Sequence, residues 1–202
     1  MKTLFKKYLL TKAPFTEGEL QTLLSAGQIK HYAKGDTIFV QGNYWNFNGF
    51  VCSGLVCTVQ EEGVQRGVVS FAGENYWVGD RRSLLTDTPM PHTAVALEDT
   101  TVLLIPHADF EQLRVLVPAF NDVVYTLVQN AVQDARRHIC AGTVMSDTER
   151  YTTFCAERPG LAQRIPAPIL ASYLKMSTEN LLKAMDDEYP VFGIKGMQQV
   201  SA

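Results

Sequence analysis

The sequence lacks the motifs that most catalytic and metal-binding sites require. No HxH, no GxSxG and no phosphate-binding loop ending in Gly-Lys-Ser/Thr occurs among its 202 residues. The four histidines lie in separate segments, so they do not suggest an oxygenase or haem site. We therefore expect no catalytic residue, no metal site and no cofactor. The histidines are His31, His92, His107 and His138.

Paired cysteines and long apolar runs are also missing. The four cysteines form no CxxC motif, and this usage favours single buried thiols in a reducing compartment over disulfides. The apolar stretch in Met1–Leu10 is too short and too interrupted for a signal peptide or a membrane span. We expect a soluble, cytoplasmic protein with no membrane partner.

An excess of positive charge is absent as well. The chain has 18 basic and 21 acidic side chains, a formal net charge of −3. This balance excludes a nucleic-acid-binding protein that relies on an overall positive charge, and any nucleic-acid site must be a local basic patch. The hydrophobic share of 46% and the charged share of 19% are ordinary for globular proteins, which excludes extensive disorder.

Helical spacing marks the start of the chain, and a β pattern follows it. Residues 4–26 predict two short helices separated at Ala13–Thr16, and Thr16 with Glu19 has the spacing of a capping box. From residue 28 to about 105, β-branched and aromatic runs are punctuated by glycine, which predicts an antiparallel sandwich or jelly roll. Within 55–60 the odd positions are the more apolar, so we expect one buried face. The expected strands are Thr37–Val40, Phe50–Cys52, Leu55–Gln60, Val64–Phe71 and Thr101–Ile105.

A long helical pattern follows, with Pro118 near its first turn and about seven turns in length. Such a helix is either a core helix or a subunit seam. Since the β domain before it could already be closed, we favour a homodimer seam. The predicted interface residues are Phe120, Val123, Val124, Leu127 and Ala131.

The C-terminal part predicts two helices joined by a tight turn. Ser146 and Asp147 can cap a helix that ends at Pro159-Gly160. Helix Ile169–Leu174, the turn at residues 175–177 and helix Thr178–Tyr189 then form a helix-turn-helix pattern. The N-terminal residues of such a second helix can meet base edges in a major groove. A plain helical hairpin that closes a C-terminal core is the alternative.

A second constellation lies between the last predicted strands. Gly79 and Asp80 precede a short helical run, and the free amides at a helix start attract phosphate, while an acid can accept from a ribose hydroxyl. An ordinary connection between strands is the alternative. Trp45 and Phe47, among asparagines, either line a pocket for an apolar effector or pack in the core.

In this order, these segments resemble the Crp/Fnr family of bacterial transcription regulators over nearly the whole chain. Tyr32–Gly42 and Val51–Val56 are similar to its β roll, Phe71–Val102 to its phosphate-binding cassette, and Glu149–Tyr151 with Leu170–Leu174 to the DNA-binding half of its Bacteroidetes-type branch. The resemblance implies an α+β fold: an antiparallel β roll or jelly roll in 1–107, a dimerisation helix in 108–145 and a helix-turn-helix domain in 146–202. It also implies a homodimer that reads a two-fold-symmetric operator in DNA.

Carried over residue by residue, the resemblance implies a degenerate nucleotide site. Gly79 matches the cassette, Asp80 stands for a glutamate, and Met90 follows Pro89 where the family has a phosphate-binding arginine. Loss of that contact costs about two or three decades in affinity. We therefore expect a small-molecule effector other than cyclic AMP, or none. The candidate ligand-binding residues are Gly79, Asp80, Arg81, Arg82, Met90, Thr126 and Asn130.

The resemblance also implies a DNA-reading set, from which the sequence departs. Met185 occupies the second basic position, and three acidic residues follow it. From residue 146 onward six basic residues stand against seven acidic ones, although phosphate neutralisation supplies most DNA affinity. Two functions stay open: a dimeric DNA-binding regulator, or a dimeric sensing or scaffold protein that has lost DNA binding. The candidate DNA-binding residues are Ser177, Thr178, Glu179, Asn180 and Lys183.

Overall fold

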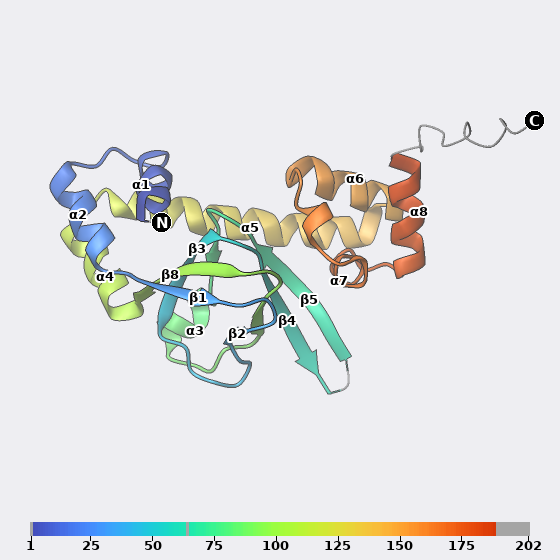
Figure 1. The fold of residues 1–202 in the computed structure, drawn as a ribbon, viewed down its shortest axis with the longest axis horizontal. Coiled ribbons are helices and arrows are strands. Elements are labelled where there is room, and N and C mark those ends of the chain that lie inside the picture. The colour runs from blue at the N-terminus through green and yellow to red at the C-terminus, as the bar shows by residue number, and fades with distance from the viewer. Residues whose placement is uncertain (1, 64, 189–202) are drawn as a thin grey trace, which may run out of the picture. The chain divides into compact units, whose positions relative to one another are not determined.

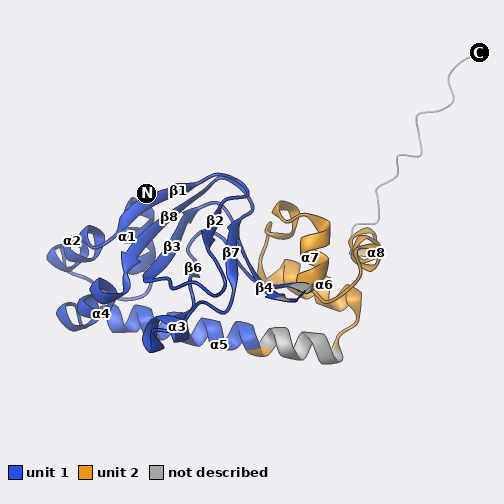
Figure 2. Cartoon of the chain, turned by 90° about the horizontal axis from the view of Figure 1, so that it is seen from below, with its two compact units in different colours: residues 1–135 blue, residues 136–202 orange. Residues whose placement is uncertain are grey.

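This computed structural model describes residues 2–63 and 65–188. The predicted start of a strand at Val64 and the predicted helix end at Tyr189 lie outside them. The chain divides into two compact units, residues 1–135 and 136–202, which are described separately (Figure 2). The division predicted at residues 107 and 145 stays a prediction.

Unit 1 is built around two antiparallel four-stranded sheets (Figure 1). One has the strand order β1-β8-β3-β6 and the other β2-β7-β4-β5. The first sheet contains β1 (Gln28–Tyr32), β3 (Phe47–Ser53), β6 (Trp77–Val78) and β8 (Thr100–Pro106). The second contains β2 (Thr37–Phe39), β4 (Val56–Glu62), β5 (Gln65–Ala72) and β7 (Thr93–Ala96). The five predicted strands are present, and β1, β6 and β7 are additional.

The helices of unit 1 stand before, between and after the strands. They are α1 (Lys2–Leu10), α2 (Glu17–Ser25), α3 (Arg81–Thr86), α4 (His107–Leu116) and the first part of α5 (Phe120–Val144). The predicted capping box begins α2: the Thr16 amide donates to Glu19 Oε2 across 2.7 Å, and Thr16 Oγ1 accepts from the Glu19 amide. No helix among the described residues is both long and apolar enough to cross a bilayer.

Strand β8 is buried on both faces because alternate side chains serve two different cores. Leu103 and Ile105 pack with residues of α1, α2, α4 and α5, while Val102 and Leu104 pack in the interior of the roll. The predicted alternation over residues 55–60 is largely present: Leu55, Cys57 and Val59 are buried, while Thr58 and Gln60 are half-buried. Val56, on the other face, is the exception, because it is buried as well.

Helix α5 confirms the predicted length, with 25 residues. Three of its predicted seam residues, Phe120, Val123 and Val124, are buried in the core of unit 1, where Phe120 packs edge-on against Phe110 of α4. An intrachain core and a subunit seam have the same helical spacing, so the sequence pattern does not distinguish them there.

Unit 2 is helical throughout its described part. Helices α6 and α7 both pack against α8, and a capping box of Ser146 and Glu149 begins α6 as the sequence predicted. Buried side chains include Phe154, Leu170 and Leu181. Its elements are α6 (Asp147–Glu157), the 3-10 turn η1 (Ala162–Arg164), α7 (Ala167–Tyr173) and α8 (Thr178–Glu188).

The connection between α7 and α8 is closed by hydrogen bonds of the Schellman type. The Met176 amide donates to the Ala171 carbonyl at 3.0 Å and the Lys175 amide to Ser172 at 3.3 Å. Lys175 takes the left-handed conformation, with φ at 55°, that glycine usually adopts at this position. The turn therefore keeps the geometry of a short helix-to-helix connection without its usual residue.

Candidate ligand-binding site

The connection between β6 and β7 holds five of the predicted ligand residues, and we call residues 79–91 the cassette. Gly79 has φ at +137°, which favours glycine, and helix α3 begins two residues later. Gly79 and the start of α3 therefore have the local geometry that the sequence suggested.

Asp80 has a structural task in the cassette. Its Oδ1 accepts a hydrogen bond from the Ser83 amide across 2.7 Å, so Asp80 is the N-cap of α3. A cap of this kind contributes about 1 kcal/mol to helix stability. A ribose hydroxyl would have to compete with that bond or use the second carboxylate oxygen.

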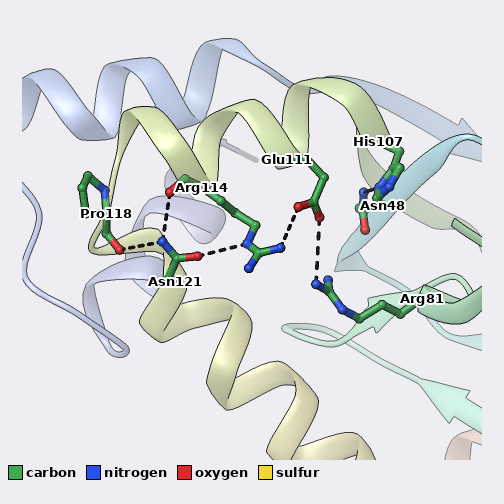
Figure 3. A network of polar contacts seen from close by, with 7 residues as sticks. All are labelled: Asn48, Arg81, His107, Glu111, Arg114, Pro118 and Asn121. Carbon is green, nitrogen blue, oxygen red and sulfur yellow. Dashed lines mark hydrogen bonds and ion pairs between the residues drawn. The ribbon is translucent and has the colours of Figure 1, made fainter. Parts of the chain in front are cut away.

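The two cassette arginines differ in their surroundings. Arg82 is exposed. Arg81 is half-buried, and its Nη2 lies 3.9 Å from Oε1 of Glu111 on α4 (Figure 3). A phosphate at the cassette would compete with Glu111 for Arg81.

Met90 is part of the roll interior. Only 1% of its surface is exposed, and it packs among Phe39 of β2, Val51 of β3 and Ala94 of β7. Its backbone is fixed by Asn43 and Gly42, with the Met90 amide donating to Asn43 at 2.9 Å and the Gly42 amide donating to Met90 at 2.8 Å. Met90 therefore packs in the core of the roll, and its role as a ligand contact stays a prediction.

Thr126 and Asn130 lie one helical turn apart on α5. The Thr126 hydroxyl donates to the Asp122 carbonyl across 2.9 Å, and its side chain is half-buried. Asn130 is exposed. Both stay predictions as ligand contacts.

The aromatic residues after β2 pack against the interior rather than stand open. The Trp45 ring lies 5.4 Å from Phe39 and 5.3 Å from Phe47, measured between ring centres. The indole nitrogen of Trp45 and the hydroxyl of Tyr32 are buried and have no hydrogen-bond partner among the described residues. An unpaired buried polar atom costs about 1–3 kcal/mol. No local sequence pattern indicates that these two atoms are buried without a partner.

His92, one of the four separate histidines, follows the cassette directly. It is half-buried, and burial lowers its pKa below the ordinary value, an effect that the nearby Asp80 carboxylate partly offsets. The described residues contain no group of three or more His, Cys, Asp and Glu side chains that could hold a metal ion.

The candidate DNA-reading residues lie at the start of α8 and are all exposed. Ser177 Oγ accepts from the Asn180 amide across 3.1 Å. Lys183 Nζ lies 2.8 Å from Glu179 Oε1, one turn away. The Asn180 side chain reaches α6, where its Nδ2 donates to Asp147 Oδ2 at 2.6 Å. The polar side chains of Ser177, Glu179, Asn180 and Lys183 therefore have partners within unit 2.

Part of unit 1 is similar to a described domain family. Residues 29–115 match the model of the cyclic nucleotide-binding domain. No curated protein matches the sequence.

Several solved structures share the fold. FixK2 from Bradyrhizobium japonicum is 17% identical with a TM-score of 0.72, covering 84% of this chain and 89% of its own. The global regulator CLP of Xanthomonas campestris, described as responsive to c-di-GMP, is 18% identical with a TM-score of 0.66, covering 87% and 92%. The Thermus thermophilus catabolite activator protein is 24% identical with a TM-score of 0.56, covering 91% and 88%. Residues 29–115 are thus similar to the cyclic nucleotide-binding domain, and the chain shares its fold with these solved structures.

Proposed function

We propose that this protein is a dimeric, DNA-binding transcription regulator of the Crp/Fnr type whose β roll no longer responds to cyclic AMP. The observation that carries the proposal is the order of its parts: a cyclic nucleotide-binding domain, a 25-residue helix and a helical unit, in a chain whose neighbours are regulators. The effector is a small molecule other than cyclic AMP, if one exists.

The loss of cyclic AMP binding is supported by the interior of the roll. Met90 offers no donor for a phosphate and fills the space between the sheets. Arg81 faces Glu111, and Asp80 caps α3. Of these three positions, Met90 is replaced, and Asp80 and Arg81 are engaged within the chain.

Dimerisation through α5 is supported by the apolar residues beyond the core. Leu127 and Val128 are half-buried, Ala131 is exposed, and Val132 is 45% exposed. They continue the three- and four-residue spacing that pairs two helices. The proposed seam begins at Leu127, about two turns after Phe120, where the sequence suggested its start.

Val132→Glu tests this seam, with Gln133→Glu on a neighbouring exposed position as the matched control. A charge in an apolar seam is costly, so the first variant sediments as a monomer while the control stays dimeric. A dimer that survives Val132→Glu with unchanged affinity removes α5 from the interface.

DNA binding would use the exposed start of α8. Lys183 reaches a phosphate only by leaving Glu179, and Asn180 reaches a base edge only by leaving Asp147. We therefore expect modest affinity with a shallow salt dependence, because few cations are free to neutralise phosphates.

Fluorescence anisotropy with a random operator pool, at about 50 mM and at about 200 mM salt, tests DNA binding directly. Lys183→Glu should weaken binding, whereas Lys7→Glu on α1, also an exposed lysine, should not. Equal affinities for the two variants would remove Lys183 from the contact set.

A scaffold or sensing protein without DNA binding is the second candidate. This candidate is favoured by the pairing of Asn180 with Asp147 and of Lys183 with Glu179. The exposed carboxylates of Asp186 and Asp187 on the same helix also favour it. A dimer that fails to bind the operator pool at about 50 mM salt would support this alternative.

A further inference from the structure

A carboxylate of α6 holds one side chain of the candidate DNA-reading set. Asp147 Oδ2 accepts a hydrogen bond from Asn180 Nδ2 across 2.6 Å, although 33 positions separate the two residues in the chain. Asp147 is the first residue of α6 and Asn180 lies in the first turn of α8, so the bond joins the starts of two helices of unit 2. It is therefore a tertiary contact, unlike the pair of Lys183 and Glu179 one turn apart on α8.

Arg150 fixes the other oxygen of the same carboxylate. Its Nη2 donates to Asp147 Oδ1, three residues earlier on α6. The Arg150 side chain is only 13% exposed, and that of Asp147 is 31% exposed. A guanidinium enclosed by its neighbours loses little further rotamer freedom when it pairs, so this ion pair is better fixed than a pair of long side chains on the open surface. Arg150 therefore keeps the Asp147 carboxylate at the position from which it reaches α8.

Neither helix needs the bond between Asp147 and Asn180 for its own cap. At α6, Ser146 Oγ accepts from the Glu149 amide across 3.3 Å, and the Ser146 amide donates to Glu149 Oε2 across 2.8 Å. At α8, Ser177 Oγ accepts from the Asn180 amide across 3.1 Å, which fixes the backbone of Asn180. The bond between the two side chains can therefore break while both caps remain.

The packing of α6 on α8 also has other support. Tyr151 and Phe154 of α6 are buried, as are Leu181 and Ala184 of α8. Burial of apolar side chains dominates the stability of such contacts, and one hydrogen bond at an exposed residue adds little to it. The contact of Asp147 with Asn180 is therefore better explained by its effect on Asn180 than by its effect on the stability of unit 2.

The bond occupies a group that a base edge would need. Asparagine reads adenine with its Oδ1 and Nδ2 together, as acceptor and donor. A hydrogen bond to a carboxylate is about twice as strong as a bond to a neutral acceptor, so Asp147 competes well with a base nitrogen for Nδ2. Because the amide group is planar, a bond at one N–H also fixes the direction of Oδ1.

We infer that Asp147 is a positioning residue that holds the Asn180 side chain against α6 and so restrains what the start of α8 can bind. Arg150 anchors the carboxylate, and the amide group of Asn180 becomes available only when its bond to Asp147 breaks. The consequence for DNA rests on the proposed function. The restraint itself is a property of unit 2 and needs no DNA.

NMR of the full chain tests the restraint without DNA. The Nδ2 protons of Asn180 should exchange with water about three- to tenfold more slowly in the unchanged protein than in Asp147→Asn. This variant keeps an acceptor for Arg150 but loses the charge. Asp186→Asn also removes one carboxylate, at an exposed position of α8, and should leave the exchange unchanged. Equal exchange in the three proteins overturns the inference.

Fluorescence anisotropy at about 50 mM salt tests the consequence, with DNA selected from the random operator pool by the Asp147→Asn protein. Asp147→Asn should bind this DNA about tenfold more tightly than the unchanged protein, the value of one bidentate contact between asparagine and adenine. Asp186→Asn removes the same charge and should change the affinity by less than about threefold. Equal gains in the two variants would assign the effect to charge alone and overturn the inference.

A double-mutant cycle separates the release of Asn180 from a general rearrangement. Asn180→Ala should change the affinity by less than about twofold in the unchanged protein, because the side chain is already held. In the Asp147→Asn background it should weaken binding about tenfold. Additive effects overturn the inference. If no variant binds DNA while the Asn180 protons exchange faster in Asp147→Asn, the proposed DNA binding is overturned and the restraint by Asp147 stands.

Discussion

The indole Nε1 of Trp77 donates a hydrogen bond to the hydroxyl of Tyr8 across 3.1 Å. This bond joins the strand before the cassette to the first helix of the chain. The two rings also pack with Phe5 and Phe50, so the bond lies in an aromatic cluster that covers the outer face of one sheet. The N-terminal helix is therefore part of the support of the cassette.

Tyr8→Phe should destabilise unit 1 by about 1–2 kcal/mol, because it leaves the Trp77 nitrogen without its acceptor. Urea denaturation monitored by fluorescence measures the change. Tyr125→Phe is the control, since Tyr125 is 65% exposed on α5. An equal decrease in the free energy of unfolding in both variants would contradict a stabilising role of the Trp77–Tyr8 hydrogen bond.

Met90→Ala should destabilise unit 1 by about 2–5 kcal/mol, since it opens a cavity between the sheets. Met90→Leu keeps the volume and should cost less than about 1.5 kcal/mol. Chemical denaturation compares these variants with Leu85→Ala, a change at a 55% exposed position on α3. A Met90→Ala protein as stable as Leu85→Ala would show that the interior tolerates the cavity.

Gly54→Ala should cost about 3 kcal/mol or more, because a Cβ at this position would lie 2.6 Å from the Thr100 Cα, a backbone atom. Gly42 has a similar positive φ but open space around it. Gly42→Ala therefore measures the backbone strain alone, about 1–2 kcal/mol. The two melting temperatures should differ clearly, and equal values would argue against the steric clash.

His92 should make the protein less stable at acidic pH. Burial lowers its pKa in the folded state, so the unfolded chain binds the proton more readily. The free energy of unfolding is therefore highest above the pKa of His92 in the unfolded chain, about 6.5, and it declines as the pH falls below that value. His92→Gln should flatten this part of the curve, as urea midpoints at several pH values will show. A slope that is the same in the variant would assign the effect to other groups.

The elements with strong local signals could be predicted from the sequence. Thr16 and Glu19 began α2 as expected, and the spacing after Pro118 gave the full length of α5. Strand β6 has only two residues, and β7 consists mostly of small side chains. Such short segments are defined by their pairing with distant strands, which a local pattern does not contain.

The candidate site was predictable only in part. A capping role for Asp80 follows from its position before a helix, and Met90 was expected to weaken phosphate binding. The burial of Met90, however, depends on Asn43 and Val51, which come from distant parts of the chain. The pairing of Arg81 with Glu111 spans thirty residues and has no local signal.

Because α5 is one continuous helix, a small change of angle after Pro118 becomes a larger displacement at its far end. At 1.5 Å per residue, its 25 residues extend about 37 Å. A tilt of about 5° at Phe120 would then sweep the far end, at Val144, through about 3 Å, the length of one hydrogen bond. The start of this helix is held by the buried ring of Phe120 and by the side-chain hydrogen bonds of Asn121.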